Sequence, residues 1–278
     1  MTILITGATG NVGRPLVEEL VTAGADVRAV SRHPHSSGFP PEVEVVDSAE
    51  AAVPGASAVF LNSRALGDEL AAIVEHARRE GVARLVALSA INADDDFSRQ
   101  PSRVRGDRNK EVEQLAVESG LQWVSLRPSV FASNFAGMWS AQIRAGDIVN
   151  GPYASASSAP IDEGDIAAVA VKALLSDDLV GQKVPLTGPH SLTNAELVDI
   201  MAGVLQRPLR YREISTELVR QRFAGLGFPA EFGDAYVAML SATVDQPALV
   251  THDVEKILGR PARSFAQWVV DHRSWFTT

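Results

Sequence analysis

The chain has 278 residues, 46% of them hydrophobic, which is enough to bury a large core in one big domain or in one domain with an appendage. It has no cysteine, which excludes disulfides and thiolate metal sites and favours a reducing, cytoplasmic compartment. The net charge of −9 without a basic tract argues against nucleic acid and anionic membrane surfaces as direct partners, and no run of 18 apolar residues predicts a membrane span.

Strand-like and helix-like patterns alternate over the first two thirds of the chain. We predict strands at residues 2–6, 26–31, 43–46, 57–62, 84–89 and 123–127, and helices at residues 11–23, 68–80 and 102–119. The strands are nearly continuous apolar runs, as is typical of strands buried on both faces. This alternation predicts an α/β fold, a doubly wound parallel sheet with helices on both faces.

The pattern loosens further along the chain. We predict helices at residues 133–145 and 162–175, a loop at 153–158 and a last short strand at 183–186. Beyond Thr193, which forms a capping box with Glu196, the chain is mostly helical, with residues 209–214 as a candidate strand. We expect a sheet domain over residues 1–150, to which residues 160–188 return, and a smaller, mostly helical C-terminal lobe over residues 189–278.

Three glycines follow the first predicted strand, and the last of them lies in the first turn of the first predicted helix. Gly7 permits a tight turn, Gly10 lets the backbone approach a pyrophosphate, and Gly13 lets the helix pack close to the sheet. The helix N-terminus then offers N–H groups and a positive dipole end to the phosphates. This pattern predicts a Rossmann site for NAD(P)(H); a glycine-rich turn without a ligand is the competing interpretation.

The second predicted strand ends without the carboxylate that usually binds the ribose 2′-hydroxyl of NAD. Arg32 stands there instead, and a guanidinium suits a 2′-phosphate, so NADP(H) is favoured over NAD(H). Asp47, after the third strand, is a candidate acceptor for the adenine amine. A solvent-exposed loop position is the competing interpretation for both residues.

The Tyr-x-x-x-Lys dyad of typical short-chain dehydrogenases is absent, because none of Tyr153, Tyr211 and Tyr236 has a lysine four positions later. Lys110 and Ser89 are the remaining catalytic candidates, competing with a solvated helix lysine and a strand-end serine bonded to backbone. Hydride transfer itself needs no protein nucleophile. The missing tyrosine therefore weakens carbonyl reduction more than reduction of quinones or activated double bonds. No metal site is expected: the loops 33–35 and 94–96 are interpreted as solvated loops.

The ordered motifs resemble those of the NmrA-like group of atypical short-chain dehydrogenases/reductases. The resemblance rests on TGATGNVG (residues 6–13), SGLQWVSLRP (119–128), Phe131, Asn134, APIDEGDIAAVA (159–170) and LTGP (186–189). It implies NAD(P)(H) binding, and it covers both reductases and redox sensors that bind the dinucleotide without turnover. Several family members carry a histidine four residues before the position of Glu113, where this chain has Asn109.

The family geometry and the rule that open α/β sheets bind ligands beyond the carboxyl ends of their strands imply the same cofactor contacts. The predicted contacts, Asp47 and Lys110 included, are Gly7, Thr9, Gly10, Asn11, Val12, Gly13, Arg32, Asp47, Leu61, Asn62, Ser63, Ser89, Ala90, Lys110, Pro128, Ser129 and Val130.

The apolar stretch after the sixth strand is predicted to wall a pocket for a small, apolar, planar substrate. The candidate substrate residues are Phe131, Asn134, Phe135, Met138, Trp139 and Phe228, and helix core packing is the alternative for the stretch 130–139. The leading hypothesis is an NAD(P)H-dependent oxidoreductase that transfers hydride to a quinone-like, conjugated or carbonyl substrate. A dinucleotide sensor without turnover and a non-redox isomerase or dehydratase are the alternatives, and both a monomer and a homodimer are compatible with the sequence.

Overall fold

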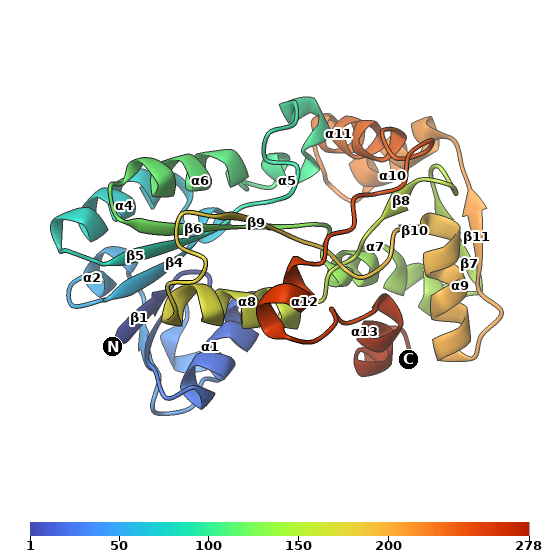
Figure 1. Cartoon of the computed structure of the whole chain (residues 1–278). Coiled ribbons are helices and arrows are strands. Elements are labelled where there is room, and N and C mark those ends of the chain that lie inside the picture. Colours follow the sequence, from blue (N-terminus) through green and yellow to red (C-terminus); the bar gives the residue numbers. More distant parts are fainter. Residues whose placement is uncertain (278) are drawn as a thin grey trace. The chain divides into compact units, whose positions relative to one another are not determined.

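The computed structural model describes residues 1–277, which form two compact units assembled from separate segments of the chain (Figure 1). Unit 1 comprises Met1–Ala93, Gly106–Pro128 and Glu163–Pro185. Unit 2 comprises Asp94–Arg105, Ser129–Asp162 and the chain from Leu186 onward. Among the described residues, no helix combines the length and the apolar character needed to cross a membrane.

Unit 1 is built on a seven-stranded sheet with the order β3-β2-β1-β4-β5-β6-β9. Its strands are β1 (Thr2–Ile5), β2 (Asp26–Val30), β3 (Glu44–Val46), β4 (Ala58–Asn62), β5 (Arg84–Leu88), β6 (Gln122–Pro128) and β9 (Lys183–Leu186). Strands β1 to β6 pair in parallel. The order 3-2-1-4-5-6 is that of dinucleotide-binding sheets, with the topological switch point between β1 and β4. The predicted doubly wound α/β fold is therefore confirmed.

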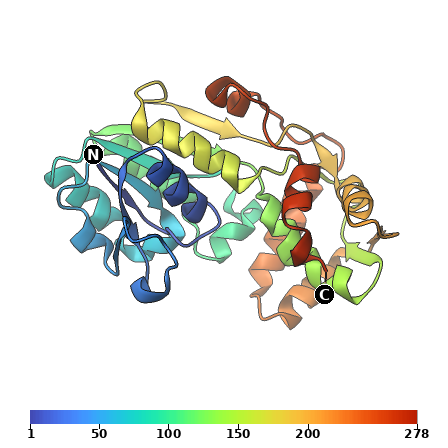
Figure 2. The same cartoon turned by 90° about the horizontal axis from the view of Figure 1, so that it is seen from below.

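Helices cover both faces of this sheet (Figure 2). On one face, α1 (Gly13–Thr22) packs beside α8 (Glu163–Leu175). On the other, α2 (Ala49–Ala52), α4 (Leu70–Arg79) and α6 (Asn109–Glu118) form a core with alternate residues of β4 and β5. Because side chains alternate along a strand, Val59 and Leu61 face this core and Phe60 faces the opposite helices. Short turns complete the unit: η1 (Pro34–Ser36), α3 (Ser63–Leu66) and η2 (Gly67–Glu69).

The single helix predicted over residues 102–119 is wrong. The structure has two helices, α5 (Pro101–Val104) and α6, separated by a turn. Gly106, within that turn, has a φ of +98°, a conformation that glycine adopts easily and that a helix does not contain. The break coincides with the boundary between the units, so α5 belongs to unit 2 and α6 to unit 1.

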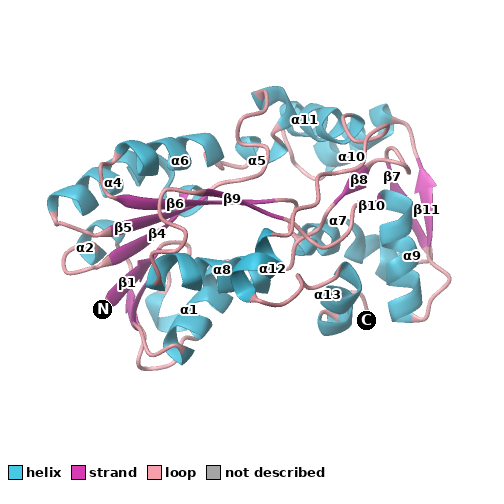
Figure 3. Ribbon diagram, viewed as in Figure 1, coloured by secondary structure: helices cyan, strands magenta, loops and turns pink. Residues whose placement is uncertain are grey.

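Unit 2 is mostly helical, with two short strand pairs (Figure 3). Besides α5 its helices are α7 (Ala132–Ala145), α9 (Asn194–Leu205), α10 (Thr216–Gly225), α11 (Ala230–Ser241), α12 (Asp253–Leu258) and α13 (Phe265–Asp271), with short turns η3 (Phe97–Arg99) and η4 (Arg273–Trp275). The parallel pair is β7 (Ile148–Gly151) with β11 (Arg210–Glu213), and the antiparallel pair is β8 (Ser157–Ser158) with β10 (Leu192–Thr193). Apolar residues of α7, α9 and α13 form its core, including Ile143, Met201 and Trp268.

The predicted capping box is present: the Thr193 side chain accepts from the Glu196 N–H, and the Glu196 carboxylate accepts from the Thr193 N–H. The candidate strand at 209–214 is confirmed as β11, whereas the predicted loop at 153–158 ends in the short strand β8. The compact units divide the chain differently from the predicted boundary at residue 150. Residues 94–105 and 129–150 lie in unit 2, since α7 buries its apolar side chains with α9 and α13.

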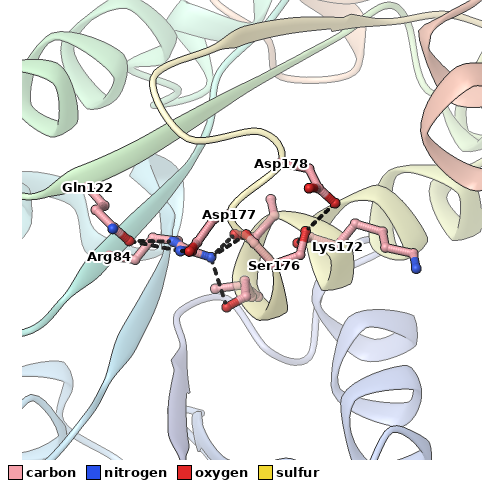
Figure 4. Close-up of polar contacts among 8 residues, drawn as sticks. Arg84, Gln122, Lys172, Ser176, Asp177 and Asp178 are labelled. Atoms are coloured by element: carbon pink, nitrogen blue, oxygen red, sulfur yellow. Dashed lines mark hydrogen bonds and ion pairs between the residues drawn. The ribbon is translucent and has the colours of Figure 1, made fainter.

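A buried arginine closes the C-terminal end of α8 (Figure 4). Arg84, at the start of β5, donates to the backbone oxygens of Ala173 (3.0 Å) and Ser176 (2.5 Å). It also donates to Gln122 Oε1 at 2.8 Å and pairs with Asp177. The last carbonyls of a helix have no hydrogen-bonding partner within the helix and form the negative end of its dipole. A guanidinium at this end donates hydrogen bonds to the carbonyls and offsets the negative charge. This contact fixes α8 to the sheet.

Candidate functional site

The glycine loop between β1 and α1 adopts a conformation that needs its glycines. Gly7 has a φ of +68°, and its carbonyl oxygen accepts from the Gly10 N–H at 3.0 Å. A Cβ added at Gly13 would overlap that oxygen and lie 2.8 Å from the Cα of Ala8. Gly13 therefore permits the close approach of helix and loop that the sequence predicts.

Helix α1 begins without any acidic group that would compete with a ligand phosphate. Val12 stands at its N-cap and supplies no side-chain cap, and the first turn contains no Asp or Glu. Thr9, Gly10 and Asn11 are exposed at the tip of the loop. Backbone N–H groups and the positive dipole end at such a helix start suit an anion.

The end of β4 lies against the glycine loop. A Cβ added at Gly7 would lie 2.8 Å from Nδ2 of Asn62, so this side chain borders the turn. Asn62 donates its backbone N–H to Thr6 Oγ1 at 2.8 Å and caps α3 through its side-chain oxygen. Leu61, in contrast, is fully buried and its side chain joins the sheet core, so only its backbone is available to a ligand. The structure thus brings together Gly7 and Asn62, two of the predicted cofactor contacts.

The ends of β2 and β3 carry the two residues assigned to the adenosine half. Val30 pairs with Val46 in the parallel register, and Ser31 donates its N–H to the Val46 oxygen at 2.9 Å. Arg32 and Asp47 follow these paired positions, and both are exposed. Both residues thus lie at the carboxyl ends of adjacent strands, and their roles at the ribose and adenine stay predictions.

Ser89, at the end of β5, is bonded to the first turn of α6. Its hydroxyl donates to the backbone oxygen of Asn109 at 2.8 Å, and only 3% of the residue is exposed. This is the backbone-bonding arrangement that competed with a substrate-orienting role for Ser89. The same contact fixes the start of the helix that carries Lys110, which is partly exposed. Ser63 supports the preceding turn, since its hydroxyl oxygen accepts from the Arg108 N–H at 2.9 Å.

A buried charged cluster, which the sequence analysis did not predict, joins α6 to β6 and β9. The Glu113 carboxylate accepts from Arg127 Nε (2.7 Å) and from the Ser125 hydroxyl (2.6 Å), and it pairs with Lys183 Nζ at 2.6 Å. Burial alone would raise the pKa of Glu113, but its hydrogen bonds to Arg127, Lys183 and Ser125 lower it from 4.5 to about 2. A single carboxylate thus fixes α6 to the last two strands of the sheet.

The last residue of β6 and the residues that follow it are divided between the two units. Pro128 is buried in unit 1, and its carbonyl accepts from the Ile91 N–H next to Ala90. In unit 2, the Ser129 hydroxyl donates to the Ala159 oxygen at 2.5 Å. Val130 and Phe131 lie beside Ile161, whose N–H donates to the Val130 oxygen at 3.0 Å.

The candidate substrate residues on α7 have different surroundings. Phe135 and Trp139 are each 3% exposed and pack in the unit 2 core, Phe135 on Phe265 with ring centroids 5.5 Å apart. These contacts favour the core-packing alternative for both residues. Asn134 is exposed and Met138 is partly buried, so these two remain candidates.

Phe228 belongs to an aromatic cluster formed by α10, α11 and their connection. Its ring stacks on Phe232 with centroids 4.4 Å apart, and Phe223 meets Phe228 and Phe232 edge to face. Tyr236 stacks behind Phe232 at 6.5 Å. Among the described residues the Tyr236 hydroxyl has no hydrogen-bonding partner. Burial raises the pKa of this side chain. Tyr211, by comparison, donates its hydroxyl to the Pro152 oxygen at 2.7 Å.

A family model described as NAD(P)H-binding matches residues 7–177, more than half of the chain. The chain belongs to this family. Its resemblance to the NmrA-like atypical short-chain dehydrogenases/reductases is thereby confirmed. The matched region contains the glycine loop, Arg32, and the residues Glu113 and Arg127 of the charged cluster.

Two curated relatives match over almost their whole length. An NAD(P)H azoreductase from Xenophilus azovorans is 31% identical over 287 residues, which cover 99% of each chain. A (4-alkanoyl-5-oxo-2,5-dihydrofuran-3-yl)methyl phosphate reductase from Streptomyces griseus is 33% identical over 294 residues, again with 99% of each chain covered.

Solved structures share the fold at lower identity. The NADPH-dependent quinone oxidoreductase of Escherichia coli, in its complex with NADPH, has a TM-score of 0.79 at 20% identity and covers 98% of this chain and 99% of its own. The triphenylmethane reductase of Citrobacter sp., complexed with NADP(H), has the same TM-score at 18% identity and the same coverage.

Proposed function

We propose that this protein is an NAD(P)H-dependent reductase that transfers hydride to a small, planar, conjugated acceptor of the quinone, azo-dye or enone class. The observation that carries the proposal is the glycine loop, where Gly13 lets α1 approach the Gly7 carbonyl at the switch point of the sheet. Full-length relatives that include an azoreductase and a reductase of a conjugated lactone support the acceptor class.

The residues around the loop fit a dinucleotide. Thr9, Gly10 and Asn11 are exposed beside an acid-free helix start, which suits the pyrophosphate. Arg32 is proposed to bind a 2′-phosphate, which makes NADP(H) the preferred cofactor. Lys110 on α6, and the backbone at Ser89, Ala90 and Pro128, are proposed to hold the nicotinamide ribose and ring. When bound, the reduced nicotinamide supplies the hydride, and these residues position it.

On the substrate side, we propose that the aromatic cluster of Phe223, Phe228, Phe232 and Tyr236 holds a planar acceptor. Aromatic rings bury a flat conjugated molecule well, and a phenol hydroxyl supplies the polar contact that fixes its orientation. The Tyr236 hydroxyl has no hydrogen-bonding partner within the described chain, so it can donate to an acceptor oxygen or azo nitrogen. With its pKa raised by burial, Tyr236 stays neutral and acts as a hydrogen-bond donor.

A dinucleotide sensor without turnover is the second candidate. The bond from the Ser89 hydroxyl to the Asn109 oxygen supports it, because this chain lacks the tyrosine–lysine dyad and one of its two catalytic candidates is engaged with backbone. The two functions share the cofactor site and differ in whether an acceptor is reduced.

The deciding experiment follows oxidation of NADPH and NADH by their nicotinamide absorbance with a quinone, an azo dye, a triphenylmethane dye and an enone. The reductase proposal expects saturable turnover of at least one acceptor, with a lower kcat/KM in the Tyr236→Phe variant. Binding of NADPH without reduction of any acceptor would support the sensor instead. Absence of binding of either dinucleotide would reject both.

A further inference from the structure

The first half of the loop between β2 and β3 gathers basic side chains although the whole chain is acidic. Over residues 31–43 the loop contains Arg32, His33 and His35, and its one carboxylate, Glu42, stands at its far end, whereas the chain carries a net charge of −9. The loop begins at the carboxyl end of β2, and Arg32 is exposed there. An exposed guanidinium at this place suits an anionic ligand group such as a phosphate monoester.

A second arginine holds this loop from outside it. Arg14 lies in the first turn of α1, immediately after Gly13. Its Nη2 donates to the backbone oxygen of Ser37 at 2.8 Å, and its guanidinium carbon lies 4.9 Å from the centroid of the Phe39 ring. A Cβ added at Gly38, which has a φ of +71°, would lie 3.9 Å from Arg14 Nη1. Arg14 therefore contacts Ser37 and Phe39, the residues on either side of Gly38.

We infer that Arg14 is a positioning residue for NADP(H) specificity, which connects the phosphate-binding helix to the loop that presents Arg32. The inference rests on the proposed cofactor function and deepens it. An exposed arginine on an unsupported loop loses conformational freedom when it binds, and a contact that already orders the loop reduces that loss. The carbonyl and ring contacts of Arg14 order the loop without using the Arg32 side chain, which stays available to a 2′-phosphate.

The inference predicts that loss of Arg14 weakens the binding of ligands that carry a 2′-phosphate and leaves the binding of other adenosine nucleotides unchanged. The probes are adenosine 2′,5′-bisphosphate and adenosine 5′-monophosphate, titrated calorimetrically into the full-length protein, with NADP⁺ and NAD⁺ in parallel. For Arg32→Met, we expect the affinity for the 2′-phosphorylated probe to fall by about 10- to 100-fold, as for loss of a charged hydrogen bond. For Arg14→Met the expected fall is about 5- to 10-fold, a typical coupling between neighbouring sites. Affinity for adenosine 5′-monophosphate should stay unchanged in both variants.

Two further variants separate positioning from direct contact. Phe39→Leu keeps every charge but removes the ring under Arg14, so it should reproduce part of the Arg14→Met effect. In the Arg32→Met background, Arg14→Met should have almost no additional effect, because the loop then has no arginine to present. Thermal melts of each variant, compared with wild type, establish that the variants are folded.

Three outcomes would overturn the inference. The first is a silent Phe39→Leu together with an Arg14→Met effect that persists in the Arg32→Met background, which indicates a direct phosphate contact. The second is an equal loss of both probes, which indicates a general structural role. The third is an Arg14→Met protein with wild-type affinities. Failure of the proposed function is a different result, since wild-type protein would then bind neither NADP⁺ nor NAD⁺.

Discussion

Replacement of Glu113 by glutamine tests whether the charged cluster in unit 1 stabilises the fold. The residue is 3% exposed and accepts hydrogen bonds from Arg127 and Ser125 besides its ion pair with Lys183. Glutamine keeps the size and one acceptor oxygen but removes the charge. Arg127, whose side chain is only 15% exposed, then loses its counterion, which is the costly way to break a buried pair.

The magnitude follows from the pKa of Glu113. Its value of about 2 in the folded chain, against 4.5 as the usual value, corresponds to about 3 kcal/mol of stability at neutral pH. Because the folded-state pKa is depressed, this contribution is complete above pH 4.5 and is lost as the pH falls towards 2. By linkage, about 1 kcal/mol is lost at pH 4 and about 2 kcal/mol at pH 3.

The assay is urea unfolding of wild type and Glu113→Gln at pH 7, 5, 4 and 3. We expect the variant to be less stable by about 3 kcal/mol at pH 7 and the gap to shrink at each lower pH. Glu75→Gln is the matched control, because Glu75 pairs with Arg78 on the exposed face of α4, where solvent screens the pair. A Glu113→Gln gap that does not change with pH, or a variant as stable as wild type at pH 7, would refute the reasoning.

Three further predictions concern the glycine loop, the α8 cap and the aromatic cluster. In Gly13→Ala the new Cβ overlaps the Gly7 oxygen, so we expect a loss of about 1–3 kcal/mol in urea unfolding together with weaker NADPH binding; unchanged unfolding would contradict the close approach. Arg84→Met leaves the last carbonyls of α8 without their donor and should cost about 3 kcal/mol in the same assay, whereas a wild-type midpoint would show that the cap is dispensable. Tyr236→Phe should lower kcat/KM for quinones by about tenfold, as for one lost hydrogen bond, and leave NADPH affinity unchanged, while Tyr211→Phe, whose hydroxyl is already bonded to backbone, serves as the control. Equal effects of the two tyrosine variants would contradict a substrate contact by Tyr236.

The sheet of unit 1 was predictable from the sequence because its signals are local. Continuous apolar runs mark strands buried on both faces, and Gly7 and Gly13 mark a strand-to-helix turn. The break between α5 and α6 was missed for the converse reason. Charged residues on both sides of Gly106 continue a helical pattern, and a single glycine inside a helix does not by itself predict a break.

The surroundings of individual side chains depended on partners that are distant in the sequence. Phe135 and Trp139 have the composition of a pocket wall, but Phe265, more than a hundred residues away, shows that they belong to a core. Glu113 similarly acquires its role from Arg127 and Lys183, which become neighbours only because β9 returns to the edge of β6. Long-range pairing of this kind leaves no periodic signal in one sequence.

These contacts hold the two ends of the proposed cofactor site in different ways. Helix α6, which carries Lys110, is fixed at its first turn by Ser89 and one turn later by the buried Glu113 cluster. The loop that carries Arg32 is exposed and is held by the Arg14 contacts instead. Groups on well-supported helices keep their geometry better than groups on loops, so we expect the end proposed for the nicotinamide to be the more rigid of the two. Changes in the β2–β3 loop should therefore alter which dinucleotide binds without disturbing the proposed hydride transfer. Changes at Glu113 should affect both dinucleotide binding and the proposed hydride transfer.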